Sequence, residues 1–303
     1  AHSQASFKGR AVKMKKIRVR NHRVVLNRSK GGDLGINIML LLIGAFMFIP
    51  MIYSVMNAFK PLEEFFYFPP HFFPRRLTLE NFTYLFQLMS SSWVPFSRYI
   101  FNTVFITVAG VLGNLIISSL CAYALSKIPF PGHKFFFQLI QKSLMFSATV
   151  AGIINFISMS LLGWVDSYLA IIVPAWATTT GLYLMKQFMD SNVSDAVLES
   201  ARLDGSSEFN TFFRIAMPMV KPAWLTLIIY SFQGLWQTGS STFIYSEELK
   251  TVNYAIGQIL SAGAVRNGAS AASSFIMMVV PIVVFLLSQS QIIETMGSSG
   301  MKD

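Results

Sequence analysis

Charged side chains are scarce in this chain of 303 residues. Asp, Glu, Lys and Arg together make up only 13% of the sequence, whereas 53% of the residues are hydrophobic. Soluble globular domains carry about 25% charged residues. A share near half that value, with a mean hydropathy of +0.52, excludes an ordinary soluble fold and indicates a membrane protein.

Reactive and metal-binding patterns are also missing. A single cysteine, Cys121, lies in an apolar run and excludes an internal disulfide framework. The four histidines stand alone without ligand-type spacing, so we expect no metal site. No GxxxxGK[ST] phosphate loop occurs, so the chain cannot act as a P-loop ATPase. Since no Ser/His/Asp or paired-carboxylate constellation falls on one side of the predicted membrane, we expect a protein that is not an enzyme.

Acidic residues are absent from the N-terminal segment. Residues 1–32 hold ten Lys and Arg without an Asp or Glu, whereas residues 33–303 hold fourteen residues of each sign. The net charge of +10 therefore belongs to one tail. We interpret 1–32 as a basic cytoplasmic tail beside anionic membrane lipid. Nucleic acid is not expected as a partner, because no aromatic interleaving or known binding module accompanies the basic residues.

Long uncharged runs predict the membrane-spanning helices. A spanning helix needs roughly 20 apolar residues, and a charge at its centre costs about 2.5–3.5 kcal/mol. Six runs meet this requirement, the third extended back past Lys142 toward Phe135: 34–59, 99–126, 143–165, 167–185, 223–246 and 267–293. The sequence thus predicts an all-α polytopic membrane protein with six transmembrane helices. The first run is too long for the apolar region of a signal peptide.

The basic residues also predict the orientation. If the N-terminus is cytoplasmic, eighteen Lys and Arg lie inside and six lie outside. Both termini are then cytoplasmic, 33–303 is a single membrane domain, 58–98 is an external loop and 190–222 is a cytoplasmic loop. The aromatic and proline residues of 58–98 suggest a lid or an interfacial platform rather than a folded domain.

The cytoplasmic loop is the longest polar block between apolar runs. Ser194 can cap a helix from Asp195 to about Asp204, which Gly205 would end in the left-handed conformation. A second helix is expected from Ser206 or Ser207 to Met217, with Pro218 stopping it and Pro222 setting the start of the next span.

The first of these helices is predicted to dock on another protein. Val197 and Ala201 share one face, and Ala201 is small enough for a partner to approach closely, whereas Glu199 lies to the side. Such a short helix needs a groove in which to bury its apolar face. The alternative is an amphipathic helix lying on the membrane, although that helix would carry Lys and Arg where this one carries acids.

Three motifs give the chain a specific resemblance. The cytoplasmic loop resembles the EAA loop of ABC importer permeases, and most of all that of the maltose-permease-like carbohydrate group. Its residues read Glu199-Ser200-Ala201-x-x-Asp204-Gly205, followed by Phe212-x-x-Ile215-x-x-Pro218-x-x-x-Pro222. The segment that runs from Tyr123 to Gly132 and the segment Leu77-Thr78-Leu79-Glu80-Asn81-Phe82 are similar to two further motifs of that group.

The resemblance has departures. Ser200 and Ser206 replace alanines of the family pattern, and both are small enough to keep close packing. Many relatives read Trp-Asn-Asp where this chain has Trp236-Gln237-Thr238, so the identity of the sugar stays open. The C-terminal segment from Ile292 to Lys302 resembles a subgroup for complex or polymer-derived oligosaccharides.

The resemblance implies the type I ABC importer permease fold in a bacterial cytoplasmic (inner) membrane. The implied partners are a second permease subunit, most often a different one, two ATPase subunits and an extracytoplasmic solute-binding protein. ATP and Mg²⁺ would be used by the partner ATPases, and this chain would bind no cofactor. Glu199 would anchor the docked helix through a basic group on the ATPase, and Asp204 and Gly205 would hold its shape.

Polar and aromatic residues within the apolar runs are candidates for the substrate pathway, because aromatic faces and amide donors suit sugar rings: Asn102, Asn114, Asn155, Trp176, Trp236 and Gln237. Hydrogen bonding between helices explains a buried Asn equally well.

Three rival functions stay open. An ABC permease for a non-sugar solute has the same loop, a secondary transporter would need an intramembrane ionisable relay or paired repeats, and a membrane enzyme would need a reactive cluster.

Overall fold

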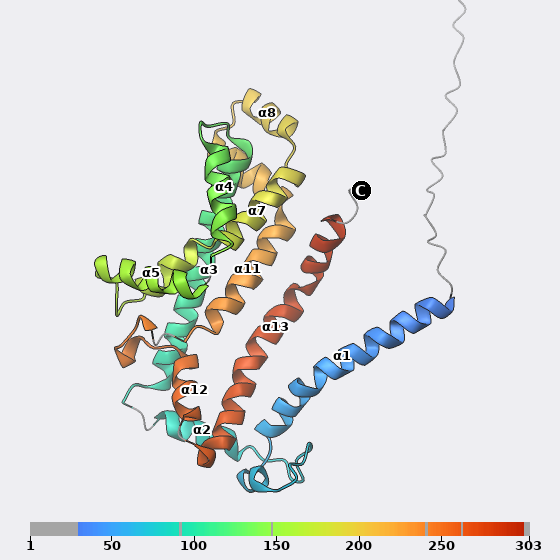
Figure 1. Cartoon of the computed structure of the whole chain (residues 1–303), viewed down its shortest axis with the longest axis vertical. Helices are drawn as coiled ribbons and strands as arrows, with labels where there is room; N and C mark the ends of the chain where they lie inside the picture. The colour runs from blue at the N-terminus through green and yellow to red at the C-terminus, as the bar shows by residue number, and fades with distance from the viewer. Residues whose placement is uncertain (1–29, 91–92, 147, 240–241, 262, 300–303) are drawn as a thin grey trace, which may run out of the picture. The chain divides into compact units, whose positions relative to one another are not determined.

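The computed structural model describes residues 30–90, 93–146, 148–239, 242–261 and 263–299. Within these ranges the chain is helical without a β-strand, which confirms the predicted all-α fold (Figure 1). Its longest helices are α1 Lys30–Ala58, α3 Phe96–Lys127, α11 Lys221–Trp236 and α13 Asn267–Ser299. The other α-helices are α2 Glu80–Ser90, α4 His133–Ser143, α5 Ala148–Leu161, α6 Leu169–Trp176, α7 Thr179–Asn192, α8 Asp195–Leu203, α9 Glu208–Thr211, α10 Met217–Met219 and α12 Val252–Leu260.

The chain forms two compact units, residues 1–50 and 51–303. The described part of the first unit is the N-terminal portion of α1, whose large apolar side chains are exposed, as in a helix that faces lipid. The second unit holds all the other helices. In Figure 1, α4 and α8 lie at one of its ends, and α2 and α12 lie at the other.

Four helices of the described ranges are long and apolar enough to cross a membrane: Gly31–Ala58, Phe96–Lys127, Leu169–Asn192 and Asn267–Gln289. A fifth is added if the bent pair Glu208–Met219 and Lys221–Trp236 counts as one span. The first, second and sixth predicted spans are therefore found as long helices, and the fourth is found as the consecutive helices α6 and α7, which together cover Leu169–Asn192. The predicted fifth span, 223–246, is shorter than expected, since α11 ends at Trp236.

The predicted third span, 143–165, is broken in the structure. Helix α4 ends at Ser143, and α5 sets off in a different direction (Figure 1). The Ser143 hydroxyl donates to the Ile140 carbonyl (2.7 Å), while the amides of Met145 and Phe146 bond only three residues back. Serine side chains that bond to the backbone compete with helix propagation in this way. The remaining apolar helix, Ala151–Leu161, is too short to cross a bilayer at about 20 residues per span.

The core forms around α3, which packs against α6, α7 and α11. Two glycines allow close contact at these crossings. A Cβ atom on Gly113 would lie 1.9 Å from the Trp176 Nε1 atom, and one on Gly110 would lie 2.5 Å from a methyl group of Leu235. Small residues at helix crossings let backbones approach closely in membranes, where packing rather than the hydrophobic effect drives association.

The described residues of the segment 58–98 form regular structure. It contains a 3₁₀ turn, Leu62–Phe66, and α2, which packs on α12 and α13 through Leu85 and Met89. The Asn81 amide donates to the carbonyls of Ala58 (2.9 Å) and Lys60 (2.7 Å), which would otherwise be unpaired where α1 ends. The Asn81 position in the Leu77–Phe82 motif therefore has a structural reason.

Replacing Gly113 with alanine should destabilise the helix packing. The added Cβ atom overlaps the Trp176 ring, and overpacking of this kind costs typically about 1–3 kcal/mol. We expect Gly113→Ala to lower the melting temperature of the purified protein in detergent. Gly234→Ala is the matched control, because a Cβ atom at this helical position meets nothing within 4 Å. Equal melting temperatures for the two variants would contradict the packing described here.

Candidate functional site

The polar loop forms a short helix, α8, at one end of α3. Ser194 precedes α8 in an extended conformation, but its side chain makes no capping bond, contrary to the sequence-based expectation. Instead, the Asp195 carboxylate in the first turn pairs with Lys127 Nζ at the last turn of α3 (2.8 Å). The start of α8 is thereby tied to a spanning helix.

Gly205 ends α8 in the predicted manner. Its φ of +81° lies in the left-handed region. The Ser206 amide donates to the Ala201 carbonyl and the Gly205 amide to the Arg202 carbonyl, each at 3.0 Å. These two bonds form a Schellman motif, which satisfies the last carbonyls of a helix and favours glycine because other residues are strained there.

The second helix of the loop continues past the predicted stop. After α9, residues Phe212–Ala216 form a π-helical turn in which the Met217 amide donates to the Phe212 carbonyl. Pro218 lies inside the helix that follows, because the wider turn accommodates a residue that has no amide proton. The chain breaks only at Val220, where it bends by 84°, and Pro222 then stands in the first turn of α11 as predicted.

The inner face of the loop differs from the sequence-based expectation. Val197 is 42% exposed, whereas Leu198 and Ala201 are buried, the latter at 8%. The expectation that Val197 and Ala201 share one face toward a partner is therefore wrong, since Ala201 packs against its own chain. Leu198 joins the core cluster of Phe212, Ala216 and α7, and Ile215 packs against that cluster.

A three-residue contact holds the other end of α8. The Arg202 guanidinium donates to both Glu208 carboxylate oxygens (2.7 and 3.4 Å), and the Tyr123 hydroxyl of α3 donates to the same carboxylate (2.9 Å). The hydrogen bond from Arg202 lowers the pKa of Glu208 against the opposing effect of burial, and the bond from Tyr123 lowers it further. The carboxylate therefore stays charged and links α8, α9 and α3.

The outer face of the loop is mixed in chemistry. Glu199, Asp204 and the apolar Leu203 (89%), Phe209 and Phe213 are all exposed. Within the described ranges, the Glu199 carboxylate has neither a hydrogen bond nor an ion pair, whereas the Ser200 hydroxyl bonds to the Ala196 carbonyl (3.0 Å). A cavity of about 450 Å³ lies beside this face, and its lining includes Lys127, Lys186, Glu199 and Arg202. Acidic, basic and apolar groups are thus presented together.

The first pathway candidate, Asn102, makes all of its described side-chain hydrogen bonds within the fold. Its amide donates to the carbonyls of Glu248 and Lys250, both at 2.8 Å, and its oxygen accepts from the Tyr168 hydroxyl (2.6 Å). Asn114 is likewise bonded to the Ala175 carbonyl and the Thr178 hydroxyl. Both asparagines therefore join segments of the chain, and the hydrogen-bonding explanation holds for them.

The other pathway candidates divide into two pairs. The indole N–H groups of Trp176 and Trp236 donate to the carbonyls of Ala109 (2.9 Å) and Met277 (3.3 Å). The side chains of Asn155 and Gln237 are exposed and make no hydrogen bond within the described part of the chain. Asn155 and Gln237 thus have free polar groups, although the structure places them on separate elements, α5 and the end of α11.

Sequence reasoning missed the contacts that fix the loop after α11. Asp166 adopts a left-handed conformation (φ 62°) and accepts the amides of Tyr245 (2.9 Å) and Ser246 (2.8 Å). Hydrogen bonds from Ser246 hold the pKa of Asp166 below its usual range. Only the isolated Asp between two apolar runs signals this role.

In the described ranges, no group of three or more His, Cys, Asp or Glu is placed to hold a metal ion.

No family model matches the chain. It is 28% identical over 258 residues to AraQ, an arabinooligosaccharides transport system permease protein of Halalkalibacterium halodurans, with 84% of this chain and 90% of AraQ covered. It is also 28% identical over 206 residues to YtcP of Bacillus subtilis, a polygalacturonan/rhamnogalacturonan transport system permease protein, with 68% of this chain and 69% of YtcP covered. UgpE of Yersinia enterocolitica, an sn-glycerol-3-phosphate transport system permease protein, is 24% identical over 270 residues, covering 88% and 96%.

The fold matches solved structures of one kind of transporter. A chain of a bacterial ABC transporter involved in the import of the acidic polysaccharide alginate superposes with a TM-score of 0.74 at 22% identity, covering 87% of this chain and 98% of that chain. A bacterial alginate ABC transporter in complex with its alginate pentasaccharide-bound periplasmic protein gives a TM-score of 0.58 at 18% identity, covering 84% and 92%.

The Glu208 contact should make the attachment of α8 dependent on pH. Because the pKa of Glu208 is lowered in the fold, its contribution to stability is complete above the ordinary glutamate value and is lost as the pH falls through the lowered pKa. A spin label at Leu203→Cys, in a Cys121→Ala background, should become more mobile on acidification. Glu208→Gln should raise the mobility at neutral pH and remove this dependence. An unchanged spectrum in Glu208→Gln would contradict the role of the contact.

Proposed function

We infer that this chain, an ABC importer permease subunit by sequence and by fold, carries a carbohydrate across the bacterial inner membrane with energy from ATP hydrolysed by separate subunits. The chain is a multi-pass membrane protein and a transport subunit rather than an enzyme. The observation that carries the proposal is the loop of α8 to α10. Its inner face is fixed to α3 by Lys127–Asp195 and by Tyr123–Glu208, and its outer face is exposed.

The outer face of α8 is the proposed docking surface for an ATPase subunit. Leu203, Phe209 and Phe213 leave apolar area exposed, and Glu199 offers a charge without a partner in the described ranges. A buried apolar contact with a neighbouring ion pair is a common way for a short helix to sit in a groove of another protein. A basic group of the ATPase would face Glu199. Asp204 and the left-handed Gly205 hold the end of α8 in shape.

Movement of the docked helix would reach the membrane through α3. Asp195 of α8 pairs with Lys127, and Glu208 of α9, which Arg202 links to α8, accepts from Tyr123. Both contacts reach the last turns of α3, which packs along α6, α7 and α11. These helices would therefore move together when two ATPase subunits close on ATP and Mg²⁺. Access to the pathway then alternates between the two sides of the membrane. With the N-terminus inside, the basic tail, the loop 190–222 and the C-terminus all face the ATPases.

The remaining partners follow from the type of importer. We propose that a second permease subunit, different from this one, completes the pathway, and that an extracytoplasmic solute-binding protein delivers the sugar. Two relatives named above are permease proteins of an arabinooligosaccharides and of a polygalacturonan/rhamnogalacturonan transport system, which supports an oligosaccharide as the substrate. Asn155 and Gln237 remain candidates for substrate contact, because their amides are free in the described chain.

A non-sugar solute is the second candidate. It is favoured by one observation, the 24% identity to a permease for sn-glycerol-3-phosphate over 88% of this chain. The coupling loop is compatible with either solute, so only the transported molecule separates the two. A secondary transporter is disfavoured, because the described fold matches ABC importers over 87% of the chain.

Changing the outer face of α8 should uncouple ATP hydrolysis from uptake. In Glu199→Lys the anchoring charge is reversed, and in Gly205→Pro the left-handed turn cannot form, because proline fixes φ near −65°. We expect both variants to insert and assemble while uptake falls at least ten-fold relative to ATP hydrolysis. Glu63→Lys, an exposed acid outside the loop, is the matched control. Normal uptake by both loop variants would refute the docking role.

A solute panel should identify the cargo. The complex of this chain with its partner subunits and binding protein is reconstituted in nanodiscs, and ATP hydrolysis is measured with neutral oligosaccharides, oligouronides and sn-glycerol-3-phosphate. We expect only saccharides to stimulate hydrolysis. Stimulation by sn-glycerol-3-phosphate alone would instead establish the non-sugar candidate, with the ABC permease role unchanged.

A further inference from the structure

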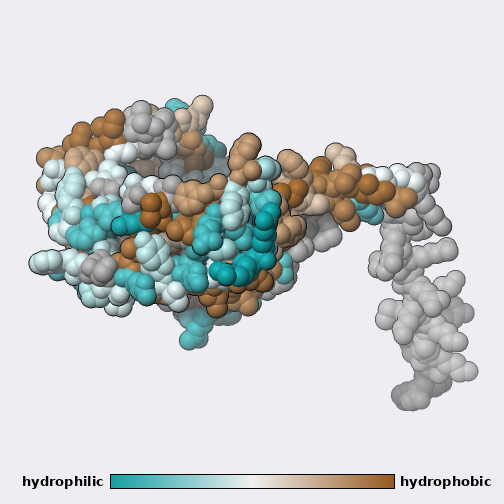
Figure 2. Space-filling view, turned by 90° about the horizontal axis from the view of Figure 1, so that it is seen from below, coloured by the Kyte–Doolittle hydropathy of each residue, from teal (hydrophilic) through white to brown (hydrophobic). Residues whose placement is uncertain are grey.

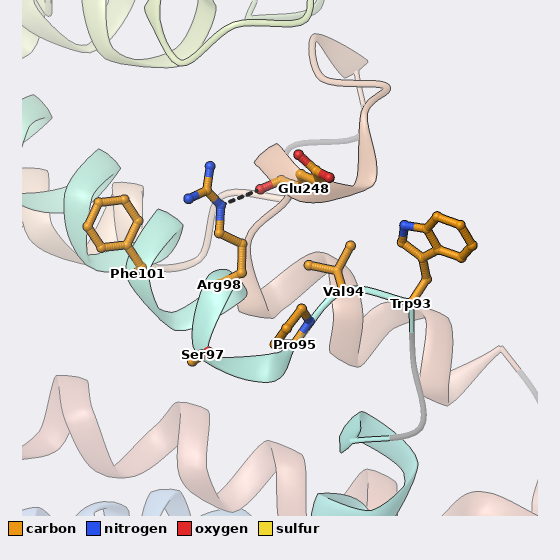
Figure 3. Close-up of a pocket in the computed structure, with 7 residues that line it drawn as sticks. All are labelled: Trp93, Val94, Pro95, Ser97, Arg98, Phe101 and Glu248. Carbon is orange, nitrogen blue, oxygen red and sulfur yellow. Dashed lines mark hydrogen bonds between the residues drawn. The ribbon is translucent and has the colours of Figure 1, made fainter.

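A second cavity lies at the opposite end of α3 from the docking surface. Its volume is about 610 Å³, within the range of about 300–1,000 Å³ that is usual for ligand sites. Its lining comes from the segment before α3, the first turns of α3 and the loop after α11 (Figure 3). The part of α3 that runs from Phe101 at the cavity to Lys127 beside α8 is about 39 Å long at 1.5 Å per residue.

Two aromatic rings border the cavity. Trp93 is 93% exposed and Phe101 is 54% exposed. Figure 3 shows Arg98 and Glu248 between these rings. Figure 2 shows this end of the molecule, where hydrophilic and hydrophobic residues are mixed at the surface. A large exposed indole beside charged groups is a typical contact for a ligand with one apolar face and several polar groups.

The charged pair in the cavity is held apart. The Arg98 Nε atom donates to the Glu248 backbone carbonyl (3.1 Å), and the same carbonyl accepts from the buried Asn102 amide (2.8 Å). The Arg98 guanidinium also lies 5.7 Å from the centre of the Phe101 ring. Within the described ranges, the Glu248 carboxylate makes no ion pair with Arg98 or with any other side chain. The terminal N–H groups of Arg98 and the carboxylate oxygens of Glu248 are therefore both free to bind.

This arrangement is fixed before any ligand arrives. Asn102 is fully buried and also bonds to Lys250 and Tyr168, so the backbone of Glu248 is anchored to the core. Arg98 is anchored in turn by the Glu248 carbonyl. Preorganised polar groups bind more tightly because less freedom is lost on binding. The cavity thus offers a donor fork in a fixed position, together with a carboxylate acceptor and an exposed aromatic face.

We propose that this cavity receives a neutral sugar ring of an oligosaccharide outside the transmembrane pathway. The ring stacks its C–H face on Trp93, its hydroxyl oxygens accept from the Arg98 terminal N–H groups, and its hydroxyl groups donate to Glu248. A neutral ring is favoured over a uronate, because a ligand carboxylate would meet the Glu248 charge as well as Arg98. The proposal rests on the proposed carbohydrate function, and it assigns a contact that the transmembrane candidates do not include.

The test uses the complete nanodisc complex without its binding protein and without ATP. The dissociation constants for arabino-oligosaccharides and for oligogalacturonides are measured by titration calorimetry. Trp93→Ala and Glu248→Gln should each weaken binding of the neutral series about ten-fold, since losing an aromatic stacking contact or a charged hydrogen bond costs about 1.5 kcal/mol. Trp93→Phe should restore most of the affinity. Because Trp93 is almost fully exposed, its loss leaves the fold intact.

Phe68→Ala is the matched control, a substitution of an aromatic residue that is 95% exposed outside the cavity. Basal ATP hydrolysis should be unchanged in all variants. Unaltered saccharide affinity in Trp93→Ala would overturn the proposal. If a separate titration with the solute-binding protein then showed weaker binding of that protein, the cavity would be a protein docking surface instead. Tighter binding of oligogalacturonides than of the neutral series would also overturn it. If no saccharide stimulates ATP hydrolysis by the wild-type complex in the solute panel, the proposed substrate class itself fails.

Discussion

The Glu208 carboxylate is where the polar loop meets the membrane helices. It accepts hydrogen bonds from Arg202 on α8 and from Tyr123 on α3, so that one side chain joins the peripheral helix to the central helix of the second unit. The Lys127–Asp195 pair makes the same connection at the other end of α8. With both ends fixed, α8 cannot shift without moving the end of α3. The proposed transmission of force depends on this attachment, because apolar packing of Leu198 alone would let a short helix slide.

Helix α3 also organises the remainder of the second unit. Gly110 and Gly113 bring Leu235 and Trp176 against its backbone, and Asn114 bonds to the carbonyl of Ala175 near the end of α6. At its first turns, Asn102 fixes the loop that contains Glu248 and Lys250. The same helix therefore supports the docking surface at one end and the Trp93 cavity at the other. The polar side chains of α3 named here hydrogen-bond within the protein and hold its segments together, so they are not free to contact a solute.

The sequence predicted the fold class, four of the six spans, and the left-handed turn at Gly205, because these depend on local composition and on backbone preference. It could not predict the break after Ser143, since the hydroxyl bond to Ile140 competes with an apolar pattern that reads as continuous. The π-turn before Pro218 was missed for a similar reason, because a proline normally marks a stop. The burial of Ala201 and the hydrogen bonds of Asn102 within the fold depend on tertiary contacts between residues that are far apart in the chain. No local pattern encodes such contacts.

The 84° bend at Val220 has a mechanical consequence. Because α10 and α11 meet at nearly a right angle, a displacement of α9 and α10 perpendicular to the membrane normal is converted into a rotation of α11 about its first turn. Val220 lies between α10 and α11 and is the pivot of this bend, and Pro222 stands in the first turn of α11. Small displacements at the α8 end of the second unit can therefore become larger displacements at Trp236, the last residue of α11.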